Sequence, residues 1–173
     1  MKKTTSTADE VYELLKSEHE QIKEMLAEVI ENTGVARDSA FRALERFMAA
    51  HEAAEETFIH SLEDSPVAQD RVYEEEKAGQ LMARLEAMDT ATEAFENAFA
   101  EFAASVETHA EAEEHEELPE LVRDASPEEL GRIYNALERV PELAVQQRGR
   151  MEPGADFASM LADAKAQFAE PSS

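Results

Sequence analysis

Residues 51–56 read His-Glu-Ala-Ala-Glu-Glu, and residues 109–114 read His-Ala-Glu-Ala-Glu-Glu. Both stretches lie in long segments without Gly or Pro, so each is expected to belong to an α-helix. Residues four apart share one face of a helix, so His51 and Glu55 point the same way, and so do His109 and Glu113. An imidazole and a carboxylate on one face form a clamp for a transition metal. The repeat therefore predicts a helical protein with two metal clamps.

The amino-acid composition and the net charge argue against several classes of protein. The 173 residues include 40 Asp and Glu but only 16 Lys and Arg, which gives a net charge of −24. This charge argues against binding to nucleic acid and to anionic membranes, because both carry negative charge themselves. The chain has no Cys, which excludes disulfides, thiolate metal sites and Cys nucleophiles. No apolar run resembles a signal sequence or a membrane span, so a cytoplasmic location is expected.

Apolar residues at helical spacing, preceded by capping residues, predict an all-α fold. Four long helices with short connections favour an up-down-up-down four-helix bundle. The first expected helix runs from about 8 to 31 after a Thr7–Glu10 capping box, and the second begins near Asp38 or Ser39. The third begins at Pro66 with Ser65 as its N-cap, and the fourth runs from a Thr90–Glu93 capping box to about Pro119.

The remainder of the chain is expected to be shorter and less regular. Ser126 caps a short fifth helix that ends near Pro141, and residues 142–154 are expected to form a linker. Apolar residues between Phe157 and Phe168 predict a short amphipathic helix that docks on the bundle or on a partner. The expected division is a bundle with its fifth helix over residues 8–140 and a linker with a C-terminal tail over 141–173.

The two halves of the predicted bundle match each other beyond the hexapeptides. Shifting the first helix by 56 positions places its apolar residues on those of the third, and shifting the second by 58 places it on the fourth. A pseudo-twofold arrangement would bring the two clamps face to face. His19 lies on the inward stripe of the first helix, and Glu75 is its counterpart in the third. The predicted site residues are His19, His51, Glu55, Glu75, His109 and Glu113, which suit two iron or manganese ions bridged by Glu55 and Glu113.

This pattern resembles the hemerythrin-like (HHE cation-binding) family, whose members are four-helix bundles with a non-haem di-iron centre. The matching segments are residues 17–20 (Ser-Glu-His-Glu), the two His-x-x-x-Glu-Glu clamps, Pro119, and Glu74-Glu75 followed by Leu81-Met82. The resemblance spans about residues 8–140. It implies that His19, His51 and His109 are terminal ligands, that Glu55 and Glu113 are bridging carboxylates, and that the two ions share an oxo or hydroxo bridge.

The chain departs from the family at two positions, and this bears on function. Glu75 stands where the family usually has His, and Gly79 stands where true oxygen carriers have a further His. A carboxylate in place of an imidazole favours the ferric state. The resemblance therefore implies peroxidase-like, catalase-like or ferrous-oxidising chemistry of the kind that relieves oxidative stress, rather than reversible oxygen carriage. The expected partners are dioxygen, peroxide or nitric oxide, together with an unidentified reductant.

Several alternatives stay open at the level of sequence. The bundle could sense iron, oxygen or nitric oxide or sequester iron without turnover, or it could be structural with a vestigial site. Glu75 could mark a lost metal position, or Glu74 or Glu76 could replace it if the helix phase differs by one residue. His60 and His115 are rotated away from the clamps and are predicted to lie on the surface. Tyr73 is expected to pack rather than to bind metal.

Overall fold

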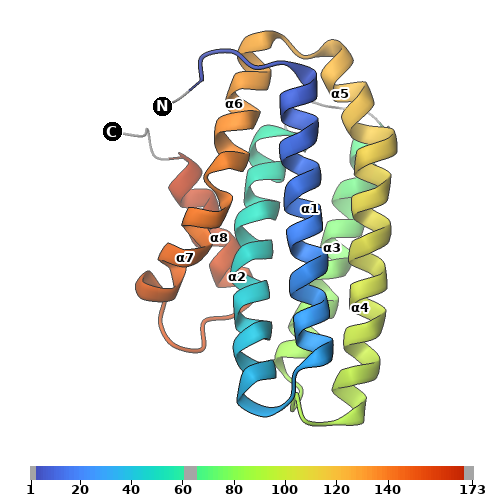
Figure 1. Ribbon diagram of the computed structural model, residues 1–173, viewed down its shortest axis with the longest axis vertical. Helices are drawn as coiled ribbons and strands as arrows, with labels where there is room; N and C mark the ends of the chain where they lie inside the picture. Colours follow the sequence, from blue (N-terminus) through green and yellow to red (C-terminus); the bar gives the residue numbers. More distant parts are fainter. Residues whose placement is uncertain (1–2, 61–65, 170–173) are drawn as a thin grey trace.

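The computed structural model describes residues 3–60 and 66–169, and these ranges contain helices but no strand. Four long helices lie side by side and alternate in direction, as Figure 1 shows. The predicted all-α, up-down-up-down bundle is confirmed. The four helices are α1 (Ala8–Glu31), α2 (Gly34–Phe58), α3 (Pro66–Glu86) and α4 (Glu93–Ala112).

The core of the bundle is closed at one end by aromatic residues. Phe41 of α2 packs edge-on against Phe95 of α4 with ring centroids 5.5 Å apart, and Phe95 stacks on Phe99 at 5.6 Å. Phe95, Phe99 and Phe102 are each at most 2% exposed. Because these residues lie near the start of α2 and of α4, they seal the end where the α1–α2 and α3–α4 connections lie. The polar residues of both hexapeptides therefore lie farther along the bundle, beyond this apolar seal.

The observed helix starts confirm one predicted cap and correct two. The Thr7–Glu10 capping box is present at the start of α1. The second helix begins at Gly34 rather than near 38, because a glycine with φ of 56° lets the chain reverse directly after α1. The fourth helix is capped by Thr92, whose hydroxyl accepts a hydrogen bond from the Phe95 amide, rather than by Thr90. The N-cap predicted at Ser65 lies outside the described residues.

The fourth helix does not end at Pro119 as predicted. A π-helical turn, η2 (Glu113–Glu117), follows α4, and α5 (Leu118–Asp124) continues from it. Pro119 stands directly after the π turn and in the first turn of α5, so it lies within the continuous helical run and does not end it. The π turn places Glu113 and Glu117 on the inner side, and both are nearly fully buried.

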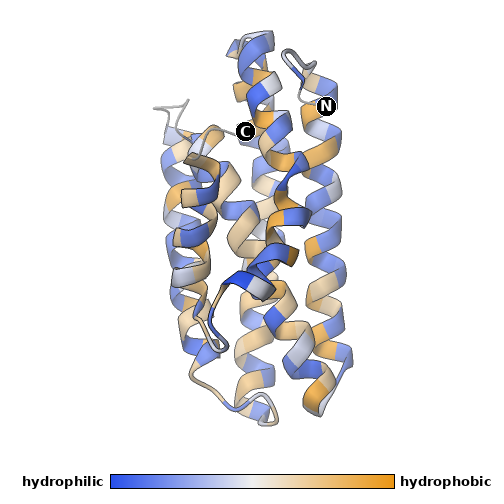
Figure 2. Cartoon of the chain, turned by 90° about the vertical axis from the view of Figure 1, so that its left-hand side faces the viewer, coloured by the Kyte–Doolittle hydropathy of each residue, from blue (hydrophilic) through white to orange (hydrophobic). Residues whose placement is uncertain are grey.

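Three further helices complete the fold: α6 (Pro127–Glu138), α7 (Val140–Arg150) and α8 (Phe157–Ala169). The predicted linker at 142–154 is wrong over most of its length, because α7 begins with Pro141 in its first turn and buries Leu143 and Gln147. The predicted amphipathic helix is confirmed as α8. Both α7 and α8 pack against α2, and Figure 2 shows polar and apolar residues interleaved along this side of the molecule. The boundary at 140/141 stays a prediction.

No helix in the described ranges is both long and apolar enough to cross a membrane.

The side chains of Glu86 and Arg42 help to hold the start of α8 and the residues before it against the bundle. Glu86 of α3 accepts a hydrogen bond from the Phe157 amide at 2.5 Å, which caps α8. Glu45 of α2 is fully buried, and Arg42 donates to it at 2.9 Å while also donating to the carbonyl of Ala155. Burial and a hydrogen bond with Glu86 outweigh the effect of Arg42 and raise the pKa of Glu45 to about 8. Glu45 therefore keeps its proton at neutral pH.

The proton on Glu45 makes the stability of the fold depend on pH. Between pH 4.5, the ordinary pKa, and about 8, the folded protein keeps a proton on Glu45 that the unfolded chain releases, so the free energy of unfolding falls as the pH rises. The neutral amide in Glu45→Gln can donate to Glu86 at any pH. Because each pH unit of this difference in protonation is worth about 1.4 kcal/mol, the difference in free energy of unfolding between Glu45→Gln and wild type should be about 3 kcal/mol more favourable to the variant at pH 8 than at pH 5.

Urea unfolding at pH 5, 6.5 and 8 measures this gain. Glu13→Gln, at an exposed position of α1, is the control and should change little with pH. A difference in the free energy of unfolding between Glu45→Gln and wild type that stays constant across this range would contradict the assignment of a proton to Glu45.

Two helical glycines predict opposite effects for the same substitution. A Cβ added at Gly79 in α3 meets no atom within 4 Å, whereas one added at Gly131 in α6 lies 2.8 Å from the backbone oxygen of Thr4. Gly79→Ala should raise the free energy of unfolding by about 0.5–1 kcal/mol, because Ala loses less backbone entropy in a helix. Gly131→Ala should lower it, because the N-terminal segment must move away. Chemical denaturation measures both free energies of unfolding, and changes of the same sign in the two variants would refute this prediction.

Candidate metal centre

The first clamp forms on α2 as the repeat predicts. His51 and Glu55 lie one turn apart, both buried, with Nε2 of His51 3.0 Å from Oε1 of Glu55. The neighbouring residues Ala49, Ala50, Ala53 and Ala54 are all buried as well. These small side chains let the adjacent helices approach α2 closely, so the polar pair lies in the middle of the bundle.

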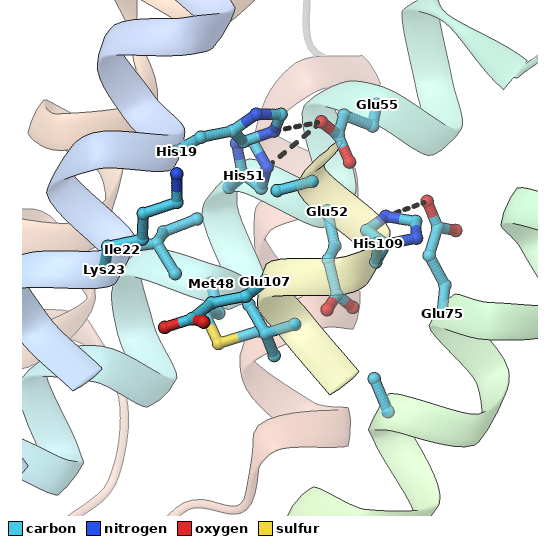
Figure 3. A pocket seen from close by; sticks show the side chains of 13 residues that line it. His19, Ile22, Lys23, Met48, His51, Glu52, Glu55, Glu75, Glu107 and His109 are labelled. Carbon is cyan, nitrogen blue, oxygen red and sulfur yellow. Dashed lines mark ion pairs between the residues drawn. The ribbon is translucent and has the colours of Figure 1, made fainter. Parts of the chain in front are cut away.

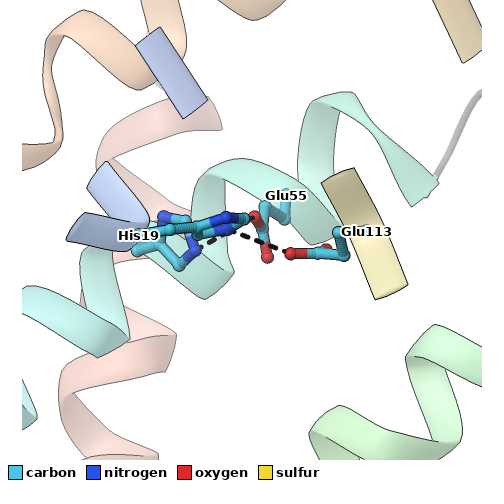
Figure 4. Close-up of side chains that lie close together, drawn as sticks. His19, Glu55 and Glu113 are labelled. Atoms are coloured by element: carbon cyan, nitrogen blue, oxygen red, sulfur yellow. Dashed lines mark ion pairs between the residues drawn. The ribbon is translucent and has the colours of Figure 1, made fainter. Parts of the chain in front are cut away.

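His19 of α1 and Glu113 of η2 complete the first half of the centre. The Nε2 atom of His19 lies 3.2 Å from Oε2 of Glu113 and 3.8 Å from Oε1 of Glu55. Figure 4 shows these three side chains converging from α1, α2 and η2. The His19 and His51 rings meet edge to face, with centroids 5.2 Å apart. Four predicted residues therefore come together at one point.

His60 belongs to the second half of the centre, and the prediction that it lies on the surface is wrong. Its side chain is 4% exposed, its Nε2 contacts Oε1 of Glu75, and its Nδ1 lies 2.7 Å from Oε1 of Glu117. The prediction assumed that the second helix continues through residue 60. In the structure α2 ends at Phe58, and the turn that follows directs His60 inward. The nearby Ser65-Pro66, which predicts the end of a helix, could have shown that helical spacing does not reliably predict the direction of side chains there.

The centre consists of two overlapping groups of possible metal ligands. One group is His19, His51, Glu55 and Glu113, and the other is Glu55, His60, Glu75 and Glu113. Within each group, one nitrogen or oxygen atom per residue lies within 4.8 Å of the others. Glu55 and Glu113 occur in both groups, which is the arrangement that bridging carboxylates require.

His109 borders the second group without joining it. Its Nε2 lies 3.5 Å from Oε1 of Glu113 and 3.9 Å from Oε1 of Glu75. The structure thus brings all six predicted residues to one centre, five of them within the two groups and His109 beside them. The role of each residue as a ligand stays a prediction.

Each of the four imidazoles is held from behind by a glutamate that sequence reasoning did not assign. The distances from Nδ1 to the nearest carboxylate oxygen are 2.7 to 3.0 Å. A carboxylate at Nδ1 fixes the ring and directs the lone pair of Nε2 toward the centre, an arrangement common among metal-binding histidines. Three of these glutamates adjoin a predicted site residue, which was the available signal. The pairs are His19–Glu114, His51–Glu18, His60–Glu117 and His109–Glu74.

The electrostatics of the centre call for positive charge. Burial lowers the pKa of His19, His60 and His109, but the neighbouring glutamates outweigh it and raise these values to about 9, 11 and 11. Both oxygens of Glu55, Oε2 of Glu113 and Nε2 of His19 are buried without a hydrogen-bond partner among the described residues. Buried polar atoms of this kind are costly unless something binds them. This mixed set of nitrogen and oxygen donors fits a transition-metal cation.

A small cavity of about 30 Å³ adjoins the centre on the side of α1 and α4. Figure 3 shows His19, His51 and His109 beside it, with Ile22 and Met48 on its wall. Its volume suffices for about one water molecule or a diatomic ligand.

Two other residues named from the sequence lie away from the centre. His115 is exposed, as predicted. Tyr73 is 64% exposed, so the expectation that it packs in the core is wrong. It lies two positions before Glu75 on α3, and since Glu75 is buried, Tyr73 faces outward.

The comparison with protein families identifies the class of protein that this fold and centre define. The Hemerythrin HHE cation binding domain matches residues 10–121, which is more than half of the chain. The chain therefore belongs to the hemerythrin HHE cation-binding family, and its His and Glu cluster could hold a metal. The comparison with curated proteins found no match, and neither did the comparison with solved structures.

Proposed function

We propose that this protein holds two iron ions in the bundle and reacts with peroxide or dioxygen, rather than carrying oxygen reversibly. The observation that carries this proposal is the pair of overlapping ligand groups that share Glu55 and Glu113. Manganese suits the same donors. His19 and His51 would serve the first position, and His60 and Glu75 the second.

The second position differs from the sequence prediction in a way that matters for chemistry. His60 supplies an imidazole from the end of α2, opposite the carboxylate of Glu75 on α3. The centre thus offers four imidazoles and three carboxylates, where three of each were expected. With His109 beside Glu113 and Glu75, both positions have nitrogen and oxygen donors. These donors support the proposal that Glu75 belongs to a second metal position.

A bound iron pair supplies the redox steps, and the chain supplies binding, orientation and charge. Reduction of one peroxide to two waters consumes two electrons and two protons, with the electrons coming from a second peroxide or from an external donor. Glu18, Glu74, Glu114 and Glu117 hold the imidazoles in place. The apolar wall formed by Ile22 and Met48 limits water on the side of the small cavity.

The surroundings of the centre favour reaction over carriage. Reversible carriage requires that a bound oxygen molecule leave unreduced, so protons must be kept away from it. Here a wide groove of about 720 Å³ reaches His60 and Glu75, and carboxyl groups line it. Protons and water therefore have a path to the second position.

Metal analysis tests the ligand assignment. After anaerobic reconstitution with ferrous iron, we expect about two irons per wild-type chain. His51→Gln and His60→Gln should each lose about one, because each removes the imidazole of one position. His115→Gln replaces an exposed histidine and serves as the matched control, with unchanged iron content.

The outcomes separate the parts of the assignment. If the His60→Gln variant retained two irons per chain, His60 would not be a metal ligand. Wild-type protein that binds neither iron nor manganese would refute the metal centre as a whole.

Peroxide consumption tests the reaction. The iron-loaded wild type should consume peroxide, and His51→Gln should lose at least about tenfold in rate, since loss of an inner ligand costs more than loss of its outer partner. His115→Gln should match wild type. Oxygen-electrode and absorbance assays measure both products and substrate. If iron raises the melting temperature but no variant or wild type consumes peroxide, the protein senses or stores iron, and the proposed reaction is wrong.

A further inference from the structure

A groove between α2, α3 and α8 leads from the surface to the second metal position. Its volume is about 720 Å³, and His60 and Glu75 lie at its inner end. Among the described residues that line it none is Lys or Arg, and Lys165 of α8 forms an ion pair with one of them, Glu56. The carboxylates that line this acidic groove are those of Glu52, Glu56, Glu75, Glu76, Glu86 and Asp156.

Glu52 is the residue that gives the groove a specific role. It is 6% exposed, and it forms no hydrogen bond or ion pair with any residue in the described parts of the chain. It lines both the acidic groove and the small cavity at the centre, and Figure 3 shows its side chain beside His51 and His109. A buried carboxyl group without a partner is costly as an anion, because burial raises its pKa, and a bound cation would satisfy it. Its position between the two spaces suits a cation that passes from one to the other.

We propose that the acidic groove is the path by which a divalent metal cation enters the centre, with Glu52 as its last stop before His60 and Glu75. This inference rests on the proposed metal centre. Glu76 is exposed on α3 at the outer part of the groove, where it attracts the cation. A cleft lined by charge of one sign concentrates counter-ions and speeds their association. Oxygen ligands along the path replace the water molecules that the cation loses.

The opposite side of the centre is unsuited to this task. The small cavity holds only about 30 Å³, and its wall includes Ile22, Met48 and Val106. Lys23 lines it and places an ammonium group near its outer side. Although Glu52, Glu55, Glu75 and Glu107 also line the cavity, its small volume and apolar wall leave no room for a hydrated cation, and the Lys23 ammonium group opposes entry at its outer side. A cation therefore enters from the acidic groove, and the small cavity is left to an uncharged ligand.

The rate of metal loading tests this path independently of turnover. Metal-free protein is mixed with Co²⁺ in a stopped-flow instrument, and the visible absorption of the bound ion reports its arrival. Glu52→Gln and Glu76→Gln should each load at least about fivefold more slowly than wild type, while the Co²⁺ content at equilibrium stays the same. Glu101→Gln removes one charge from an exposed position of α4 and should load at the wild-type rate.

A second variant blocks the path without changing charge. Gly79 lines the acidic groove, and a side chain added there meets no atom within 4 Å of its Cβ. Gly79→Leu should therefore slow loading without disturbing the fold, and circular dichroism checks the fold.

Two outcomes would overturn the path. One is that Glu52→Gln and Gly79→Leu both load at the wild-type rate. The other is that Glu107→Gln, at the small cavity, slows loading and the groove variants do not. Either result with normal Co²⁺ content at equilibrium leaves the metal centre intact. Wild-type protein that takes up no Co²⁺ would refute the centre itself.

Discussion

The carboxylates of Glu55 and Glu113 lie buried in the middle of the bundle, between imidazoles from α1, α2 and α4. Two like charges this close repel each other, and burial removes the water that would screen them. Only cationic partners can hold such a pair in place, whether protonated imidazoles or metal ions. The positions of the surrounding histidines, and of the glutamates behind them, follow from this requirement.

Two irregular features of the backbone serve the same pair. The π turn at the end of α4 buries Glu113 and Glu117 together, so that one faces the centre and the other holds His60. The end of α2 at Phe58 frees His60 from helical phase and directs it inward. Irregular turns inside or at the ends of helices often occur at functional sites, because regular periodicity cannot place every side chain that a site needs.

Sequence periodicity predicted the features that repeat and missed those that break the repeat. The bundle, both clamps, His19 and Glu75 follow from helical spacing and from the match between the two halves. His60 was missed because its position depends on where α2 ends, and helix ends are poorly specified by local sequence. The helix at 140–150 was missed because Pro141 reads as a stop, although a proline in the first turn of a helix is harmless. The outer glutamates were missed because the chain has too many acidic residues for any one to stand out.

The break in the match between the two halves, where Glu75 stands opposite His19, therefore has a different meaning in three dimensions. In the sequence, the third helix lacks the histidine that symmetry would supply. In the structure, His60 brings an imidazole to Glu75 from the end of α2, so the group of possible ligands around Glu75 includes a nitrogen donor. The histidines of the two ligand groups are held differently, however. His19 and His51 lie within regular helices, whereas His60 follows the last turn of α2. Helix ends open more readily than helix interiors. The group around His19 and His51 is therefore the more rigidly preformed, and the proposed second position, which faces the acidic groove, is the one where side chains can rearrange if a cation or an oxidant arrives.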